Sequence, residues 1–344
     1  MSQNEVTRDG LEHTAPGREA TVGVNTGAGE DVARPRKGRR GGEQPMVPEA
    51  QFSSYYDKAI INSPVWEAPD IPGYLFLGGL AGASSVLAAG AQLTSRPALA
   101  RAAKLAATGA VSLSFAALVH DLGRPARFAN MLRTFKPTSP MSVGSWLLSA
   151  YAPAAMVASL SAATGRARRL GNLATAGAAA VGPLVATYTA ALITNTAVPS
   201  WHDGYREMPF VFAASAMSAA AGVGLIAAPS EEVAPLRRLG AASGAAEVAL
   251  TKVMEKRMGL VGEAYELGKA RRYGRLALGL TSLGAAGAAL CGHRRWLAQL
   301  SGAALVAGSA LERFAIFESG FVSAEDPKYT VVPQRMRRAA RTAG

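Results

Sequence analysis

The sequence predicts an all-α, polytopic membrane protein with about eight transmembrane helices. Charged residues make up only 17% of the 344 residues, hydrophobic residues make up 49%, and the charges gather between long apolar stretches. A transmembrane helix needs about 20 mostly apolar residues, and several stretches meet that length. Glycine is abundant, at 37 residues, and small residues let helix backbones approach closely in lipid.

Five candidate spans are clear and three are weaker. Residues 71–93 carry no charge, and the second span extends backwards past Lys104, whose ammonium group would reach the membrane surface. An even number of spans places both termini on one side, but Lys and Arg are plentiful in the loops of both sides, so the positive-inside rule gives no orientation. The clear spans are 71–93, 105–119, 143–164, 172–194 and 209–228, and the weaker ones are at about 236–253, 275–292 and 295–317.

The sixth candidate span differs from the others because Glu247 lies in its middle. A carboxylate at bilayer depth costs a few kcal/mol unless it is paired, and such residues are usually functional. Glu247 is therefore a candidate for a proton relay. The alternative is an amphipathic helix at the membrane surface, in which case the count of spans is seven.

The chain divides into three predicted parts. Residues 1–54 form a hydrophilic, basic tail without apolar periodicity, which predicts disorder. Residues 55–320 form the membrane domain, and residues 321–344 form a basic C-terminal tail. The net charge of +12 includes the run "RPRKGRRGG" in the first tail. A solvated tail near anionic lipid is favoured over a nucleic-acid partner, which we do not expect.

The sequence lacks the residues of a resident redox centre. One cysteine, Cys291, excludes a disulfide framework and a cysteine-ligated Fe–S cluster within this chain. Buried b-haem would need axial histidines facing each other inside the bundle. One histidine lies in the tail and three lie at span ends, so we expect no haem and no metal: His13, His120, His202 and His293.

Polar residues gather where the second span ends, in "HDLGRPARF". Asp121 is close in sequence to Arg124 and Arg127, so these residues form either a structural ion pair that closes the loop or a site for a ligand or a proton. The sequence leaves both interpretations open.

Three stretches, "YLFLGGLAGASSVLAAG", "DLGRPARFANMLRTFKPTSPMSVGSW" and "NTAVPSWHDGYRE", resemble the NrfD-like membrane subunits of polysulphide reductase and related complexes. The resemblance runs from about residue 55 to about residue 320. It implies two four-helix bundles in a bacterial inner membrane, anchoring a ferredoxin-like [4Fe–4S] subunit that often carries a molybdopterin catalytic subunit. It also implies a quinone or quinol site near the Fe–S subunit. The chain itself would then be a quinone-reactive subunit, or otherwise a non-catalytic one.

The resemblance also suggests which residues serve the quinone. The start of the first span contributes polar contacts to the quinone headgroup in the family, which indicates Tyr74 here, although some relatives have histidine at this position. His120 is a second candidate donor, and Asp121 is a candidate proton relay held ionised by Arg124. The end of the second span matches the family at Asp121, Leu122, Gly123, Arg124, Pro125, Arg127 and Phe128.

Two further sets of residues have expected roles. The loop after the second span is expected to dock the Fe–S subunit through Arg127, Arg133 and Lys136. The spacing of Gly78, Gly79 and Gly82 predicts a close helix–helix contact.

Two other functions remain as alternatives to a quinone-reactive subunit. One is a passive membrane anchor without quinone chemistry. The other is an ion-translocating transporter, with which Glu247 is compatible. Transporter folds tend to carry broken helices at matching positions of two halves, whereas Pro153 and Pro183 lie in neighbouring spans.

Overall fold

The computed structural model divides into two units, residues 1–64 with 321–344, and residues 65–320. Each unit is described by itself below. The structure describes residues 3–7, 10–14, 53–54, 59–122, 126–290 and 294–343.

In the unit that contains both termini, the described residues include three short strands and a C-terminal helix. Strands β1 (Gln3–Thr7) and β2 (Gly10–Thr14) pair antiparallel, and β3 (Ser53–Ser54) pairs with the other edge of β1. Helix α11 (Lys328–Ala343) is rich in arginine. The prediction that residues 1–54 lack fixed structure falls mostly outside the described residues, and these strands are what the structure describes there.

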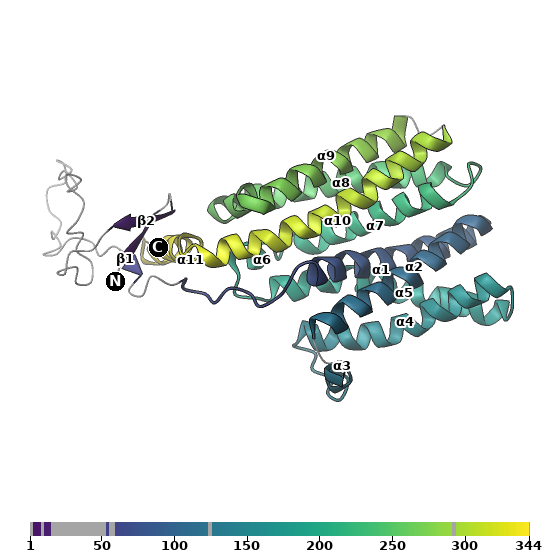
Figure 1. The fold of residues 1–344 in the computed structure, drawn as a ribbon, viewed down its shortest axis with the longest axis horizontal. Coiled ribbons are helices and arrows are strands. Elements are labelled where there is room, and N and C mark those ends of the chain that lie inside the picture. The colour runs from purple at the N-terminus through teal and green to yellow at the C-terminus, as the bar shows by residue number, and fades with distance from the viewer. Residues whose placement is uncertain are drawn as a thin grey trace, which may run out of the picture. The chain divides into compact units, whose positions relative to one another are not determined.

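The second unit is helical, and its long helices run side by side (Figure 1). Short helical segments fill three of the connections: α3 (Ala126–Met131), α6 (Pro199–His202) and the 3₁₀ helix η1 (Gly259–Glu266). The long helices are α1 (Asp70–Leu93), α2 (Pro97–Asp121), α4 (Pro140–Thr164), α5 (Arg168–Thr194), α7 (Met208–Ala227), α8 (Ala234–Met258), α9 (Gly268–Leu290) and α10 (Arg295–Glu325).

Proline and glycine mark several helix ends. Proline occupies the first turn of α2, α4, α7 and α8. A backbone N–H in the first turn has no acceptor within the helix, so proline, which lacks the N–H, costs no hydrogen bond there. Ser139 begins α4 by accepting a hydrogen bond from the backbone N–H of Ser142 at 3.4 Å. Gly165 ends α4 with a positive φ of 71°, a conformation that glycine adopts without strain.

The helices pack in two neighbouring groups. In the first group, α1 packs against α2 and α5, and α4 packs against α2 and α5. In the second, α8 packs between α7 and α9, and α10 lies along α7, α8 and α9 (Figure 1). Helix α7 also contacts α1, α2 and α5, so it joins the two groups.

Six of the helices in the described part of the chain are long and apolar enough to cross a membrane: α1, α2, α4, α5, α7 and α10. The predicted all-helical, multi-pass membrane domain is therefore confirmed. Helices α8 and α9 correspond to the weaker predicted spans at 236–253 and 275–292, and they fall short of this hydropathy. The predicted count of eight is not reached by composition alone.

Glycines set the distance between the helices. Gly82 of α1 and Gly182 of α5 meet backbone to backbone, and neither position has room for a side chain. Gly222 of α7 and Gly302 of α10 make the same kind of contact in the second group. Such contacts let helices approach more closely than larger residues permit.

The predicted packing glycines of α1 face three different helices. Gly78 faces Ser114 of α2, and Gly79 faces Ala216 of α7. Gly82 faces Gly182 of α5. One turn of α1 therefore contacts both helix groups.

Charged side chains cap helices at the end opposite α3. Glu232 accepts hydrogen bonds from the backbone N–H groups of Ala98 and Leu99 at the start of α2, at 3.3 and 2.7 Å. Arg295 donates to the carbonyls of Leu225 and Ile226 at the end of α7, at 3.0 and 2.7 Å. Each charge opposes the partial charge of the helix end that it meets.

Candidate functional site

The candidate site begins with a pair of buried tyrosines. Tyr74 of α1 is 4% exposed, and its hydroxyl group hydrogen-bonds to the hydroxyl of Tyr188 on α5. The two rings meet edge to face with centroids 6.5 Å apart. Gly144 of α4 lies against the Tyr188 ring and leaves no room for a side chain of its own. Three helices therefore fix the position of the Tyr188 ring.

Tyr188 also lines an open groove of about 520 Å³. The groove lies between the start of α4, the end of α5 and the α6 segment, and its volume is in the range of small-molecule sites. Pro140, Val143 and Ala191 give it an apolar wall. The polar side chains in its lining are those of Thr138, Tyr188, Thr194, Asn195, His202 and Tyr205.

The groove's histidine has a defined hydrogen-bond partner. His202 Nδ1 lies 3.0 Å from the backbone carbonyl oxygen of Thr194. A carbonyl accepts only, so Nδ1 carries the hydrogen and the neutral ring has its lone pair on Nε2. Arg257 of α8 fixes the chain just after the groove residue Tyr205, because it donates to both carboxylate oxygens of Glu207 at 2.5 and 2.6 Å.

The predicted charged residues at the end of α2 lie close to the first residues of α1. His120 Nδ1 lies 2.6 Å from Asp70 Oδ2, and the His120 side chain is 80% exposed. The backbone of Glu67 lies close to the Asp121 carboxylate. Neither His120 nor Asp121 lines the groove. Tyr74 follows Asp70 by four residues, which is about one helical turn.

The ion pair of Asp121 with Arg124, one of the two interpretations that the sequence leaves open, falls partly outside the described residues. Arg124 lies outside the described residues. Arg127 donates to the backbone carbonyl of Leu122 at 3.0 Å. Phe128 of α3 packs edge to face on Phe115 of α2, with centroids 4.5 Å apart, which anchors α3 to the long helix.

The loop between α3 and α4 is held by hydrogen bonds and carries two of the predicted docking residues, whereas Arg127 lies on α3. Arg133 and Lys136 are exposed, as is Arg127. The Ser142 hydroxyl accepts from the backbone N–H of Lys136 at 3.0 Å and donates to the carbonyl of Thr134 at 3.1 Å. The loop is thus fastened to the first turn of α4, next to the groove.

Comparison with protein families decides the relationship of this chain. The family model described as "Polysulphide reductase, NrfD" matches residues 60–234, just over half of the chain. The chain belongs to the NrfD family. No curated protein matches it. Membership agrees with a multi-pass membrane subunit of the kind found in oxidoreductase complexes.

The NrfD match covers the first helix group and the groove. Tyr74, His120, Asp121 and Tyr188 all lie within it. The match ends at the first residue of α8, so Glu247 lies beyond it, as do α9 and α10.

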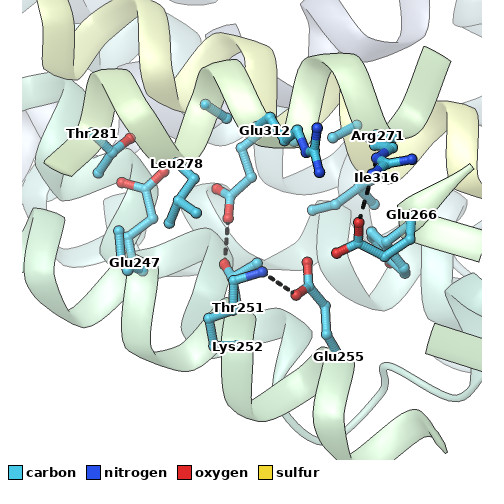
Figure 2. Close-up of a pocket in the computed structure, with 16 residues that line it drawn as sticks. Glu247, Thr251, Lys252, Glu255, Glu266, Arg271, Leu278, Thr281, Glu312 and Ile316 are labelled. Atoms are coloured by element: carbon cyan, nitrogen blue, oxygen red, sulfur yellow. Dashed lines mark hydrogen bonds and ion pairs between the residues drawn. The ribbon is translucent and has the colours of Figure 1, made fainter. Parts of the chain in front are cut away.

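Outside the NrfD match, Glu247 belongs to a second, buried polar cluster (Figure 2). Glu247 is 2% exposed, Glu312 is 5% exposed and Arg313 is 1% exposed. Arg313 donates to Glu312 at 3.1 Å and to the carbonyl of Phe212 at 3.1 Å, and its guanidinium lies 3.7 Å from the Phe212 ring centroid. Thr251 donates to Glu312 at 2.7 Å. Glu247 thus faces α10 instead of lipid.

Several site residues were missed by sequence reasoning. Tyr188 is one tyrosine in an alanine-rich span, and nothing local distinguishes it. Glu312 and Arg313 did have a signal, because two adjacent charges interrupt the last apolar stretch. Tyr265 of η1 lies close to the cluster, where burial raises the pKa of its hydroxyl group, so it stays neutral.

Proposed function

We propose that this chain is the membrane anchor and quinone- or quinol-reactive subunit of an oxidoreductase complex. It would exchange electrons between a ferredoxin-like [4Fe–4S] subunit and the membrane quinone pool, and a molybdopterin subunit would complete the complex. The observation that carries the proposal is the open groove beside Tyr188, which lies within the NrfD match.

The residues of the groove fit a quinone headgroup. Such a ring is flat and apolar and carries two carbonyl acceptors. Pro140, Val143 and Ala191 supply apolar surface, and the Tyr188 hydroxyl and the Asn195 amide supply hydrogen-bond donors. A bound quinone would take up two electrons and two protons when it is reduced to the quinol.

The tyrosine pair orders the donor. When Tyr188 donates its hydroxyl hydrogen into the groove, its oxygen accepts from Tyr74. Tyr74 is then a positioning residue, because it does not line the groove itself. A donor fixed in advance stabilises negative charge that develops on an oxygen in an apolar site. Nε2 of His202 would accept a proton from a quinol, and in the charged form it would return one.

A surface route for protons is proposed at the start of α1. His120 is exposed and bonded to Asp70, so it would exchange protons with solution and pass them to that carboxylate. Asp121, which lies beside Glu67, would contribute a negative charge to this cluster. The cluster lies one helical turn from Tyr74. Arg124 is proposed to keep Asp121 ionised between proton transfers.

The partner would dock on the loop that ends at the groove. Electrons reach the quinone by tunnelling, so the donor cluster must lie near the site. Lys136 directly precedes Pro137, which lines the groove, and Arg127 and Arg133 are exposed nearby in sequence. A partner bound to these cations would therefore lie next to the groove.

Eight spans in two four-helix bundles form the proposed membrane arrangement, in a bacterial inner membrane. Helices α8 and α9 have 25 and 23 residues. At 1.5 Å per residue these lengths exceed the hydrocarbon thickness of about 30 Å. Helix α8 packs between α7 and α9 and buries Glu247, which supports a spanning helix over an interfacial one.

The test is Tyr188→Phe in the assembled complex, with quinone-dependent electron transfer as the readout. Loss of one fixed donor is expected to lower the maximal rate by about 100-fold. Tyr151→Phe is the matched control, because Tyr151 is also buried in the first helix group and bonds Ser85 at 2.7 Å, away from the groove. Equal rates in the two variants would overturn the proposal and favour a passive anchor.

A further inference from the structure

The second helix group contains a cavity that the proposed quinone site does not use. It has a volume of about 60 Å³ and is lined from α8, η1, α9 and α10. Its inner end holds Glu247, Thr281 and Glu312, and Figure 2 shows Glu312 pointing toward Thr251. At its other end lie two ion pairs, Lys252–Glu255 at 2.6 Å and Arg271–Glu266 at 3.8 Å.

The two buried carboxyl groups require a proton. Glu247 is 2% exposed and Glu312 is 5% exposed, and both line the same cavity. Two ionised carboxylates in one buried place repel each other, and neither can donate a hydrogen bond to the other. Arg313 provides one positive charge for two carboxyl groups, so one shared proton makes the cluster neutral. Neutrality is strongly favoured in such a buried, low-dielectric place.

Two unpartnered atoms point to water in the cavity. Glu247 Oε2 and Thr281 Oγ1 are buried without a hydrogen-bond partner, and both residues line the cavity. A volume of about 60 Å³ exceeds the ~10–15 Å³ that a site needs to hold one water molecule, so the cavity has room for water. Water bonded to these atoms would connect the carboxyl pair with the ion pairs at the other end.

The opposite direction is closed by tight packing. Gly240, Gly244 and Gly284 all pack closely on Leu305 of α10, which is fully buried. Leu305 belongs to an apolar cluster with Leu225 and Leu236. At the other end of the cavity, Glu255, Glu266 and Arg271 line it near η1, so this is the end from which we expect protons to reach the carboxyl pair.

We propose that Glu247 and Glu312 hold one exchangeable proton, loaded from the η1 end through this cavity. The site is distinct from the quinone groove and lies beyond the NrfD match. The charged groups that face it are Glu312 and Arg313 from α10, Lys252 and Glu255 from α8, Glu266 from η1, and Arg271 and Arg275 from α9. Helix α7 contributes the Phe212 carbonyl, which accepts a hydrogen bond from Arg313, and it has no ionisable residue.

The test uses infrared spectroscopy of the purified protein in lipid vesicles. A protonated, buried carboxylic acid gives a carbonyl stretching band that ionised carboxylates lack, and the band shifts in D₂O when the proton exchanges. The native protein should show this band at neutral pH, with the D₂O shift. Absence of the band, or a band that never shifts in D₂O, would overturn the proposal.

Variants assign the band and the path. Glu247→Gln keeps the Arg313–Glu312 pair and should remove the band, whereas Glu318→Gln on α10, outside the cavity lining, should leave it. Thr251→Val should keep the band and slow its D₂O shift several-fold, which a purely structural hydroxyl would not do. A band that persists in Glu247→Gln would overturn the assignment. So would loss of the native band on adding Na⁺ at constant pH, because the site would then bind a cation.

Discussion

The hydroxyl groups of Tyr74 and Tyr188 hydrogen-bond to each other, although the two residues are 114 positions apart in the sequence. Only Tyr188 also lines the groove. In the proposed function, the inner member, Tyr74, orients the outer member, Tyr188, which would contact the quinone. This division changes the role expected for Tyr74, which the family resemblance had suggested as a direct contact.

Tyr74→Phe should slow quinone turnover without abolishing it. The substitution removes one hydrogen bond behind the donor, worth about 1 kcal/mol, so a loss of roughly fivefold to tenfold in kcat is expected. The KM for quinone should change little, because the groove lining is intact. A steady-state assay on the assembled complex measures both constants. A loss as large as that in Tyr188→Phe would show that Tyr74 contacts the quinone itself.

His120→Ala should slow proton delivery at the start of α1. His120 is exposed and bonded to Asp70, so a small soluble base can reach the vacated place. Added imidazole should restore a large part of the turnover. The same addition should do nothing for Tyr188→Phe, which serves as the control. If His120 only holds Asp70 in position, imidazole will not restore the rate.

Gly82→Ala should destabilise the first helix group. An added Cβ would collide with the backbone of Gly182, and overpacking of this kind costs about 1–3 kcal/mol. Gly90→Ala is the matched control on the same helix, because nothing lies within 4 Å of a Cβ added there. Thermal unfolding in detergent compares the two. Equal midpoints would mean that α1 and α5 separate easily at this crossing.

Glu232→Ala should lower the stability of the protein by about 1 kcal/mol, because the first N–H groups of α2 lose their acceptor. Glu231→Ala changes the neighbouring exposed carboxylate and should have little effect. Thermal unfolding again provides the measurement. A larger effect at Glu231 would contradict the capping role of Glu232.

A crosslinker placed at Lys136 should reach the Fe–S subunit. Lys136→Cys carries the probe next to the groove, and Arg168→Cys carries it at the first residue of α5. Mass spectrometry of the crosslinked complex identifies the product. Reproducible crosslinks to that subunit from position 168 alone would place the partner on the other side of the membrane.

The sequence predicts the fold better than it predicts the site. The charge-free stretch 71–93 coincides with α1 because hydropathy along a helix is a local property. Glu247 was recognised by its cost in lipid, but its partners Glu312 and Arg313 lie more than sixty residues later. Tyr188 could not be selected, because its place beside the groove depends on how α4 and α5 pack.

The glycine crossings also matter for protein engineering. Because Gly82 meets Gly182 and Gly222 meets Gly302 through main-chain atoms, the helix separations do not depend on side-chain rotamers at those points. Ala191 lines the groove and lies on the same helix as Gly182, so it can be exchanged without altering the crossing of α1 and α5. Libraries that vary this position while keeping the four glycines would test the proposed headgroup selectivity on a constant framework.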